Sequence, residues 1–162
     1  MSVFKTTFSR ALRAHPSDSA VIASPNTANV GGATTSAATN KLINSSAKFS
    51  TASIYPGDVV HNDTAGTAAT VVSVDSDTQL TLNADIFTTS GQAYVVYSMS
   101  PQAGIGQTGA YLYVAVTGNV SVITIGGDIA TFAAVPAGTV LPVQAIQLRA
   151  TSTTSTNVMA LW

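Results

Sequence analysis

The sequence predicts an all-β fold made of two small antiparallel β modules, of the sandwich or barrel type, with glycine-rich linkers and a short N-terminal arm. Composition favours strands, because the 162 residues include 23 Thr and 18 Val but no Glu. Apolar runs also recur about every 8–12 residues between turns that contain Gly, Pro or Asp, which is the pattern of antiparallel β proteins. No segment after residue 14 reads as a helix.

The N-terminal part is predicted to be an arm, residues 1–22, that packs with the C-terminal module. Pro16 restricts the residue before it to extended backbone, so any helix over residues 6–13 should end there. Residues 23–40 are small and polar and contain paired glycines, a composition typical of linkers.

Residues 41–98 are predicted to form an inserted, barrel-like β module. Pro56-Gly57 has the chemistry of a turn, and Asp75-Ser76-Asp77 separates the two strands of a hairpin. A second linker over residues 99–109 leads to the C-terminal β module, residues 110–162.

The chain carries very little charge. Only 8% of its residues are charged, with a formal net charge of -1, against roughly 25% charged residues in ordinary globular domains. Six Lys and Arg residues cannot supply the basic footprint of a nucleic-acid binder. No apolar run is long enough to span a membrane, and the first residues lack the apolar stretch that a secretory signal needs. We therefore expect neither nucleic acid nor membrane as a partner, and a surface that other subunits cover.

Two motifs suggest cofactor or metal chemistry, but each lacks the required context. Residues 104–109 match the dinucleotide pattern G-x-G-x-x-G, yet a predicted strand follows where that motif needs a helix. His61 and Asp63 share a strand face near Asp58 and could form a metal site or an acid–base pair. A zinc site needs three or four ligands and the only other histidine is His15, so we expect no metal and no cofactor.

Catalytic signatures are equally weak. Asp75-Ser76-Asp77 lacks the Gly and Glu that complete a calcium loop, and the chain has no G-x-S-x-G nucleophile elbow. We therefore expect no enzymatic activity. Strand tyrosines could stack on sugars, although aromatic side chains in strands more often pack against neighbouring strands; these residues are Tyr94, Tyr97, Tyr111 and Tyr113.

Segments of the C-terminal module resemble the head-spike base proteins, a capsid-decoration family of tailed phages and phage-derived gene transfer agents. The segments that carry this resemblance are Tyr111-Leu112-Tyr113-Val114, residues 127–132, residues 135–143 and the Thr-rich turn at residues 151–156. The N-terminal Pro16-Ser17-Asp18 is similar to the start of the same family, although residues 19–110 separate it from the Tyr-Leu-Tyr-Val strand. Residues 41–98, which would be an insertion, resemble a small β module that recurs in phage virion proteins.

The resemblance implies a homo-oligomeric structural protein of a tailed-phage virion, either a decoration (cement) protein or a head-spike base. Its partners would be further copies of itself and the major capsid protein, with a head-fibre protein as a further candidate, on the outer surface of the head after synthesis in the host cytoplasm. A tail-associated adaptor or fibre component and a carbohydrate-binding adhesin are the alternatives. Candidate interface residues are aromatic or apolar, and Trp162 could instead cap the core of its own module; the candidates are Phe4, Phe8, Tyr111, Tyr113, Leu161 and Trp162.

Overall fold

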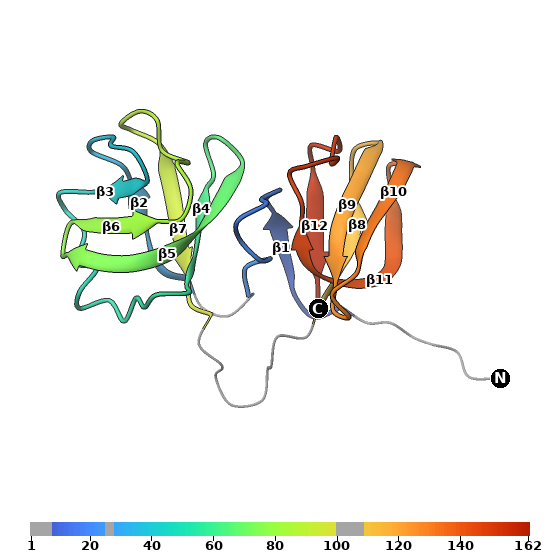
Figure 1. Cartoon of the computed structure of the whole chain (residues 1–162), viewed down its shortest axis with the longest axis horizontal. Helices are drawn as coiled ribbons and strands as arrows, with labels where there is room; N and C mark the ends of the chain where they lie inside the picture. The colour runs from blue at the N-terminus through green and yellow to red at the C-terminus, as the bar shows by residue number, and fades with distance from the viewer. Residues whose placement is uncertain (1–7, 25–27, 100–108) are drawn as a thin grey trace.

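A computed structural model describes residues 8–24, 28–99 and 109–162, and over these residues the chain is all-β (Figure 1). Strands form two antiparallel sheets of six strands each, which confirms the predicted fold class. The strands are β1 (Ala11–Ala14), β2 (Ala28–Ala33), β3 (Lys41–Ile43), β4 (Val59–Asn62), β5 (Thr67–Ser76), β6 (Gln79–Leu82), β7 (Ala93–Tyr97), β8 (Ala110–Val114), β9 (Gly118–Thr124), β10 (Ile129–Val135), β11 (Thr139–Leu148) and β12 (Val158–Leu161).

The C-terminal module is a sheet in the order β1-β12-β8-β11-β9-β10. Its central strands alternate buried and half-buried residues, the period of two that places every second side chain on one face. β11 changes partners along its length, pairing with β8 through its first residues and with β9 through its last, with register shifts between. The sheet therefore folds over on itself and encloses a core.

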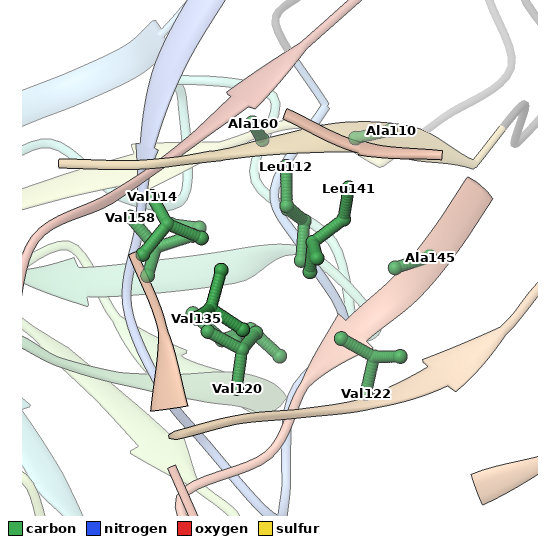
Figure 2. Close-up of a cluster of buried hydrophobic side chains, with 12 residues drawn as sticks. Ala110, Leu112, Val114, Val120, Val122, Val135, Leu141, Ala145, Val158 and Ala160 are labelled. Atoms are coloured by element: carbon green, nitrogen blue, oxygen red, sulfur yellow. The ribbon is translucent and has the colours of Figure 1, made fainter. Parts of the chain in front are cut away.

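Small aliphatic side chains fill that core (Figure 2). Leu112 and Val114 of β8 face Val120 and Val122 of β9 across it, and all four are fully buried. Burial of apolar surface stabilises a fold by about 25 cal/mol for each Å² removed from water. Val and Ala occupy most positions, so this core depends on close packing of small side chains rather than on large aromatic ones.

The second module is a sheet in the order β2-β7-β4-β5-β6-β3. β5 is ten residues long and pairs with β4 at its start and with β6 at its end, with register shifts that bend it. Larger side chains form this core, with Phe49 and Phe87 in ring contact with Tyr94 at centroid distances of 6.1 and 6.3 Å.

One sequence prediction is wrong at the element level, and one element that the sequence left open is a strand. Residues 28–33, predicted as part of a linker over residues 23–40, form β2 and pair with β7, so the inserted module begins earlier than residue 41. Residues 11–14, at the end of the short stretch considered for a helix, form β1 and pair with β12. In both places the backbone completes the edge of a sheet, a tertiary contact that local composition does not encode.

The β1–β12 pairing joins the N-terminal arm to the C-terminal module, as the sequence predicts. The described residues contain no helix, and hence none that is long and apolar enough to cross a membrane. The predicted linker over residues 99–109 falls almost wholly outside the described residues.

Candidate functional site

Residues 15–24, here called the connecting segment, lie between the two sheets and bind both of them (Figure 1). On the C-terminal side, the backbone NH of Ser17 donates to the carbonyl of Leu148, and Gln147 donates to the carbonyl of Ser17. On the inserted-module side, the hydroxyl of Ser17 donates to the carbonyl of Ala68 at 2.8 Å. Asn83 Nδ2 donates to the carbonyl of Ser19 at 2.6 Å.

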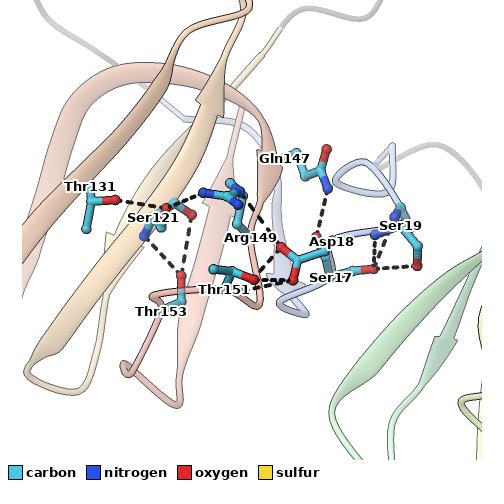
Figure 3. Close-up of polar contacts among 10 residues, drawn as sticks. Ser17, Asp18, Ser19, Ser121, Thr131, Gln147, Arg149, Thr151 and Thr153 are labelled. Carbon is cyan, nitrogen blue, oxygen red and sulfur yellow. Dashed lines mark hydrogen bonds and ion pairs between the residues drawn. The ribbon is translucent and has the colours of Figure 1, made fainter.

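Asp18 fixes the connecting segment to the C-terminal module (Figure 3). Its carboxylate accepts hydrogen bonds from the hydroxyl and the backbone NH of Thr151, and it lies 3.8 Å from Arg149 Nε. The hydrogen bond from the Thr151 hydroxyl is the largest cause that holds the pKa of Asp18 below its ordinary value. The backbone NH of Thr151 and the positive charge of Arg149 contribute less.

A small apolar cluster backs these polar bonds. Ala20 and Ala23 of the connecting segment are buried against Val59 of β4 and Ala68 of β5. Since three of these four residues are alanines, the two backbones approach closely and a larger or charged side chain would not fit.

At the start of the connecting segment, His15 meets two residues of the inserted module. His15 Nε2 lies 3.1 Å from Asp63 Oδ1, although 48 positions separate them in the sequence. The rings of His15 and His61 are perpendicular, with centroids 4.5 Å apart. One ligand atom from each of the three residues lies within 4.8 Å of the other two. We call these three residues the His-His-Asp cluster.

Burial dominates the electrostatics of the cluster. His61, only 3% exposed, has its pKa lowered to about 3, first by burial and then by the nearby His15. The pKa of His15 is also lowered, because the cost of burying a charge outweighs its hydrogen bond to Asp63. Both imidazoles are therefore neutral at pH 7, the form in which histidine binds metal ions.

The sequence identified part of this cluster and excluded the rest. His61 lies in β4 and Asp63 in the turn directly after it, and both belong to the cluster, but Asp58 does not join them. Asp58 is buried and accepts hydrogen bonds from the backbone NH groups of Tyr55 and Met99. His15 provides the third potential ligand atom. The sequence leaves it out of the site, because no local pattern indicates that the N-terminal arm packs next to β4.

The predicted interface residues lie together around β8 and β12, apart from Phe4, which falls outside the described residues. The Phe8 and Tyr111 rings are in contact at 5.7 Å, and Leu161 pairs with Tyr111 across the strands. Trp162 packs against the core of its own module, which is the alternative that the sequence analysis left open for it.

A different surface, around β10, exposes large apolar side chains. β10 is an edge strand that pairs only with β9 in the described part of the chain. Its sequence, IATFAAV, has no charge, and Ile129 is 62% exposed. Ile125, on the other side of the Gly126-Gly127 turn, is 51% exposed. Uncharged, unpaired edges with exposed apolar residues are the surfaces on which strands of another chain add.

Two other sequence hypotheses receive structural explanations. Asp75, considered for a calcium loop, is held within its hairpin by Lys41 and Ser73, among others. Tyr94, considered for sugar stacking, is 1% exposed and its hydroxyl accepts a hydrogen bond from Asn44, so its ring cannot reach a ligand.

Comparisons of the chain with models of protein families, with curated proteins and with solved structures found no match. A function is therefore inferred from the sequence, the fold, the His-His-Asp cluster and the β10 edge.

Proposed function

We propose that this chain is a structural protein of a tailed-phage virion, a homo-oligomer that decorates or cements the head shell or forms the base of a head spike. The virion assignment rests on the resemblance of residues 110–162, and the observation that carries the homo-oligomer is the edge of β10. It is the longest of the four edge strands, it is uncharged, and it exposes Ile129 to solvent.

Edge strands of monomeric proteins are usually protected by charges, by Pro or by being very short. Among the other edges, β3 has three residues beginning with Lys41 and β1 contains Arg13, whereas β2 is uncharged like β10 but one residue shorter. β10 has a register shift between Phe132 and Val135, but residues 129–132 pair regularly with β9 and none of them is charged or Pro. The occupant we propose for this edge is a second copy of the chain, which pairs along β10 and covers Ile125 and Ile129.

Overall composition supports the same conclusion. A chain with 8% charged residues has little charge repulsion to keep copies apart. The resemblance of residues 110–162 to head-spike base proteins supports a place on the head, with the major capsid protein as the second partner. The adhesin alternative loses Tyr94 as a sugar-stacking residue, because that ring is buried.

The test is the mass of the purified chain, measured by size-exclusion chromatography with light scattering. We expect an oligomer, and Thr131→Lys, which places a charge on the β10 edge, should shift the mass toward the monomer. Val72→Lys is the matched control, because Val72 is also exposed but lies on β5 of the other module. A wild-type monomer at all concentrations contradicts the proposed oligomer.

Placement on the virion needs a separate measurement. Gold-labelled antibody against the chain, applied to phage particles from the host that carries the gene, should label heads. Labelling confined to tails would instead identify the tail-associated alternative, and no labelling would remove the virion proposal.

A further inference from the structure

We propose that His15, His61 and Asp63 form a binding site for a divalent transition-metal ion of the zinc type, which clamps the connecting segment to the inserted module. This proposal does not depend on the virion function. It concerns the junction of the two modules, whereas the assembly proposal concerns β10.

The geometry is close to that of a metal site. A tetrahedral zinc ion with bonds of about 2.0–2.1 Å holds its ligand atoms roughly 3.3 Å apart. His15 Nε2 and Asp63 Oδ1 already lie 3.1 Å apart. All three ligand atoms lie within 4.8 Å of one another, so at most about 1.5 Å of closure, within the reach of a side-chain rotation, completes the triangle.

The contacts of His15 are compatible with a metal ligand. The Nδ1 side of its ring faces Gly66, and Nε2 is hydrogen-bonded to Asp63 Oδ1 at 3.1 Å. A neutral imidazole has one ring proton, which either nitrogen can carry. With that proton on Nδ1, Nε2 would bind a cation shared with Asp63 in place of the present hydrogen bond. A backbone carbonyl on the other ring nitrogen is also the usual orienting contact of a metal-bound histidine.

His61 provides the second, independent observation. Its side chain is buried next to His15, and within the described residues it makes ring contacts, with His15 and with Tyr97, but no hydrogen bond. The described residues contain one fully enclosed side-chain polar atom without a partner, Thr67 Oγ1, so the ring nitrogens of His61 are not sealed off from a ligand. A metal ion held between His61 and His15 would give His61 a polar partner.

Ligand chemistry selects the ion. Two imidazoles and one carboxylate suit Zn²⁺ and the neighbouring first-row ions, whereas Mg²⁺ and Ca²⁺ prefer sites made only of oxygen atoms. The side chain of Asp63 is 45% exposed, which leaves the fourth position open to water. Arg13 acts against the ion, because its positive charge lies close enough to affect His15.

The test is calorimetric titration of the chelator-treated full chain with zinc chloride. We expect one zinc ion per chain, and Asp63→Asn should weaken binding by at least about tenfold, since losses of outer-shell contacts alone cost about 10–100-fold. Asp128→Asn, which alters an exposed carboxylate on the β9–β10 turn of the other module, is the matched control and should bind like the wild type.

Two further variants exclude trivial explanations. Arg13→Gln removes a repelling charge and should tighten binding by roughly threefold or more, which non-specific binding to surface residues would not show. His61→Gln should abolish binding, and circular dichroism must show that it is still folded for that loss to count. Zinc should also raise the melting temperature of the wild type more than that of Asp63→Asn. Absence of binding, or binding equal in the wild type and Asp63→Asn, overturns the proposal.

The two proposals can fail separately. A monomeric chain that binds zinc would remove the assembly proposal alone. An oligomeric chain that ignores zinc would remove the metal site alone.

Discussion

Asp75 shows how a few polar residues stabilise a chain with little charge. Its carboxylate accepts hydrogen bonds from Gln79, Lys41, Ser73 and Thr81, which come from β3, β5 and β6. These bonds, with Gln79 the largest contributor, hold the pKa of Asp75 far below its ordinary value. The side chain is partly exposed, so the bonds order the hairpin rather than fill a core.

This pKa shift predicts a pH-dependent effect of Asp75→Asn. A carboxyl group whose pKa is depressed by folding stabilises the folded state above its ordinary pKa, and that contribution is lost as the pH falls through the folded pKa. The variant should therefore be less stable than the wild type at pH 7, by roughly 1–2 kcal/mol. The deficit should shrink below about pH 4, where the carboxyl group takes up a proton in the unfolded wild type but not in the folded one, so that the contribution of Asp75 to stability falls.

Urea unfolding at pH 7 and pH 3 measures this difference. Asp77→Asn is the control, because among the described residues only Lys48 Nζ, at 3.4 Å, bonds to the Asp77 side chain in this hairpin turn. An Asp75→Asn deficit that stays constant from pH 7 to pH 3 would show that the ionised carboxylate is not the stabilising group.

The His-His-Asp cluster shows how far sequence can go at this scale. His61 and Asp63 could be paired from the sequence because strand periodicity places them on one face. His15 could not be added, because its approach depends on the path of the connecting segment between the two modules. That path is a tertiary property, and only Pro16, which disfavours a helix there, pointed toward it.

At the scale of elements, the sequence predicts strands well where side chains alternate and poorly where glycines replace them. β8 and β12 alternate regularly and were expected. β2 contains Gly31-Gly32 and reads as a linker, yet Gly32 has a packing reason: a Cβ there would lie 2.9 Å from Asn44 Nδ2 and 3.1 Å from the Tyr94 hydroxyl. The glycine thus makes room for a buried hydrogen bond that the sequence does not reveal.

Gly118, at the start of β9, makes a closer approach and yields a prediction. A Cβ at this position would lie 2.6 Å from the backbone nitrogen of Ser155, which side-chain rotation cannot relieve. Gly118→Ala should therefore displace the Thr-rich turn from β9 and cost about 1–3 kcal/mol of the free energy of unfolding, in the range of overpacking.

Gly126→Ala is the matched control for this change. A Cβ at Gly126 would meet only side-chain oxygens, at 3.5 and 3.6 Å, which is ordinary contact. Chemical denaturation of both variants compares them directly. Equal stability of the two would mean that the turn at residues 151–156 moves away from β9 at no cost, contrary to the packing described here.

At the scale of the whole molecule, the two β modules and their order along the chain were predictable, because turn residues divide the sequence at regular intervals. The way in which the modules meet was not. Their junction is built from alanines, backbone carbonyls and short polar side chains, residue types that occur throughout this sequence and have no distinctive pattern.

This junction predicts cooperative unfolding of the two modules. Ala23 is 1% exposed and packs with Ala20, Val59 and Ala68 between them. An unpaired carboxylate buried there costs several kcal/mol. That cost is larger than the stabilisation that packing among these four small side chains can provide. Calorimetry should therefore give one transition for the wild type and two for Ala23→Asp, as each sheet melts on its own core. Ala38→Asp, at an exposed alanine of the inserted module, should keep the single transition.

Two transitions in the wild type would show that the connecting segment does not couple the modules. One unshifted transition in Ala23→Asp would show that the alanine contact does not hold them together.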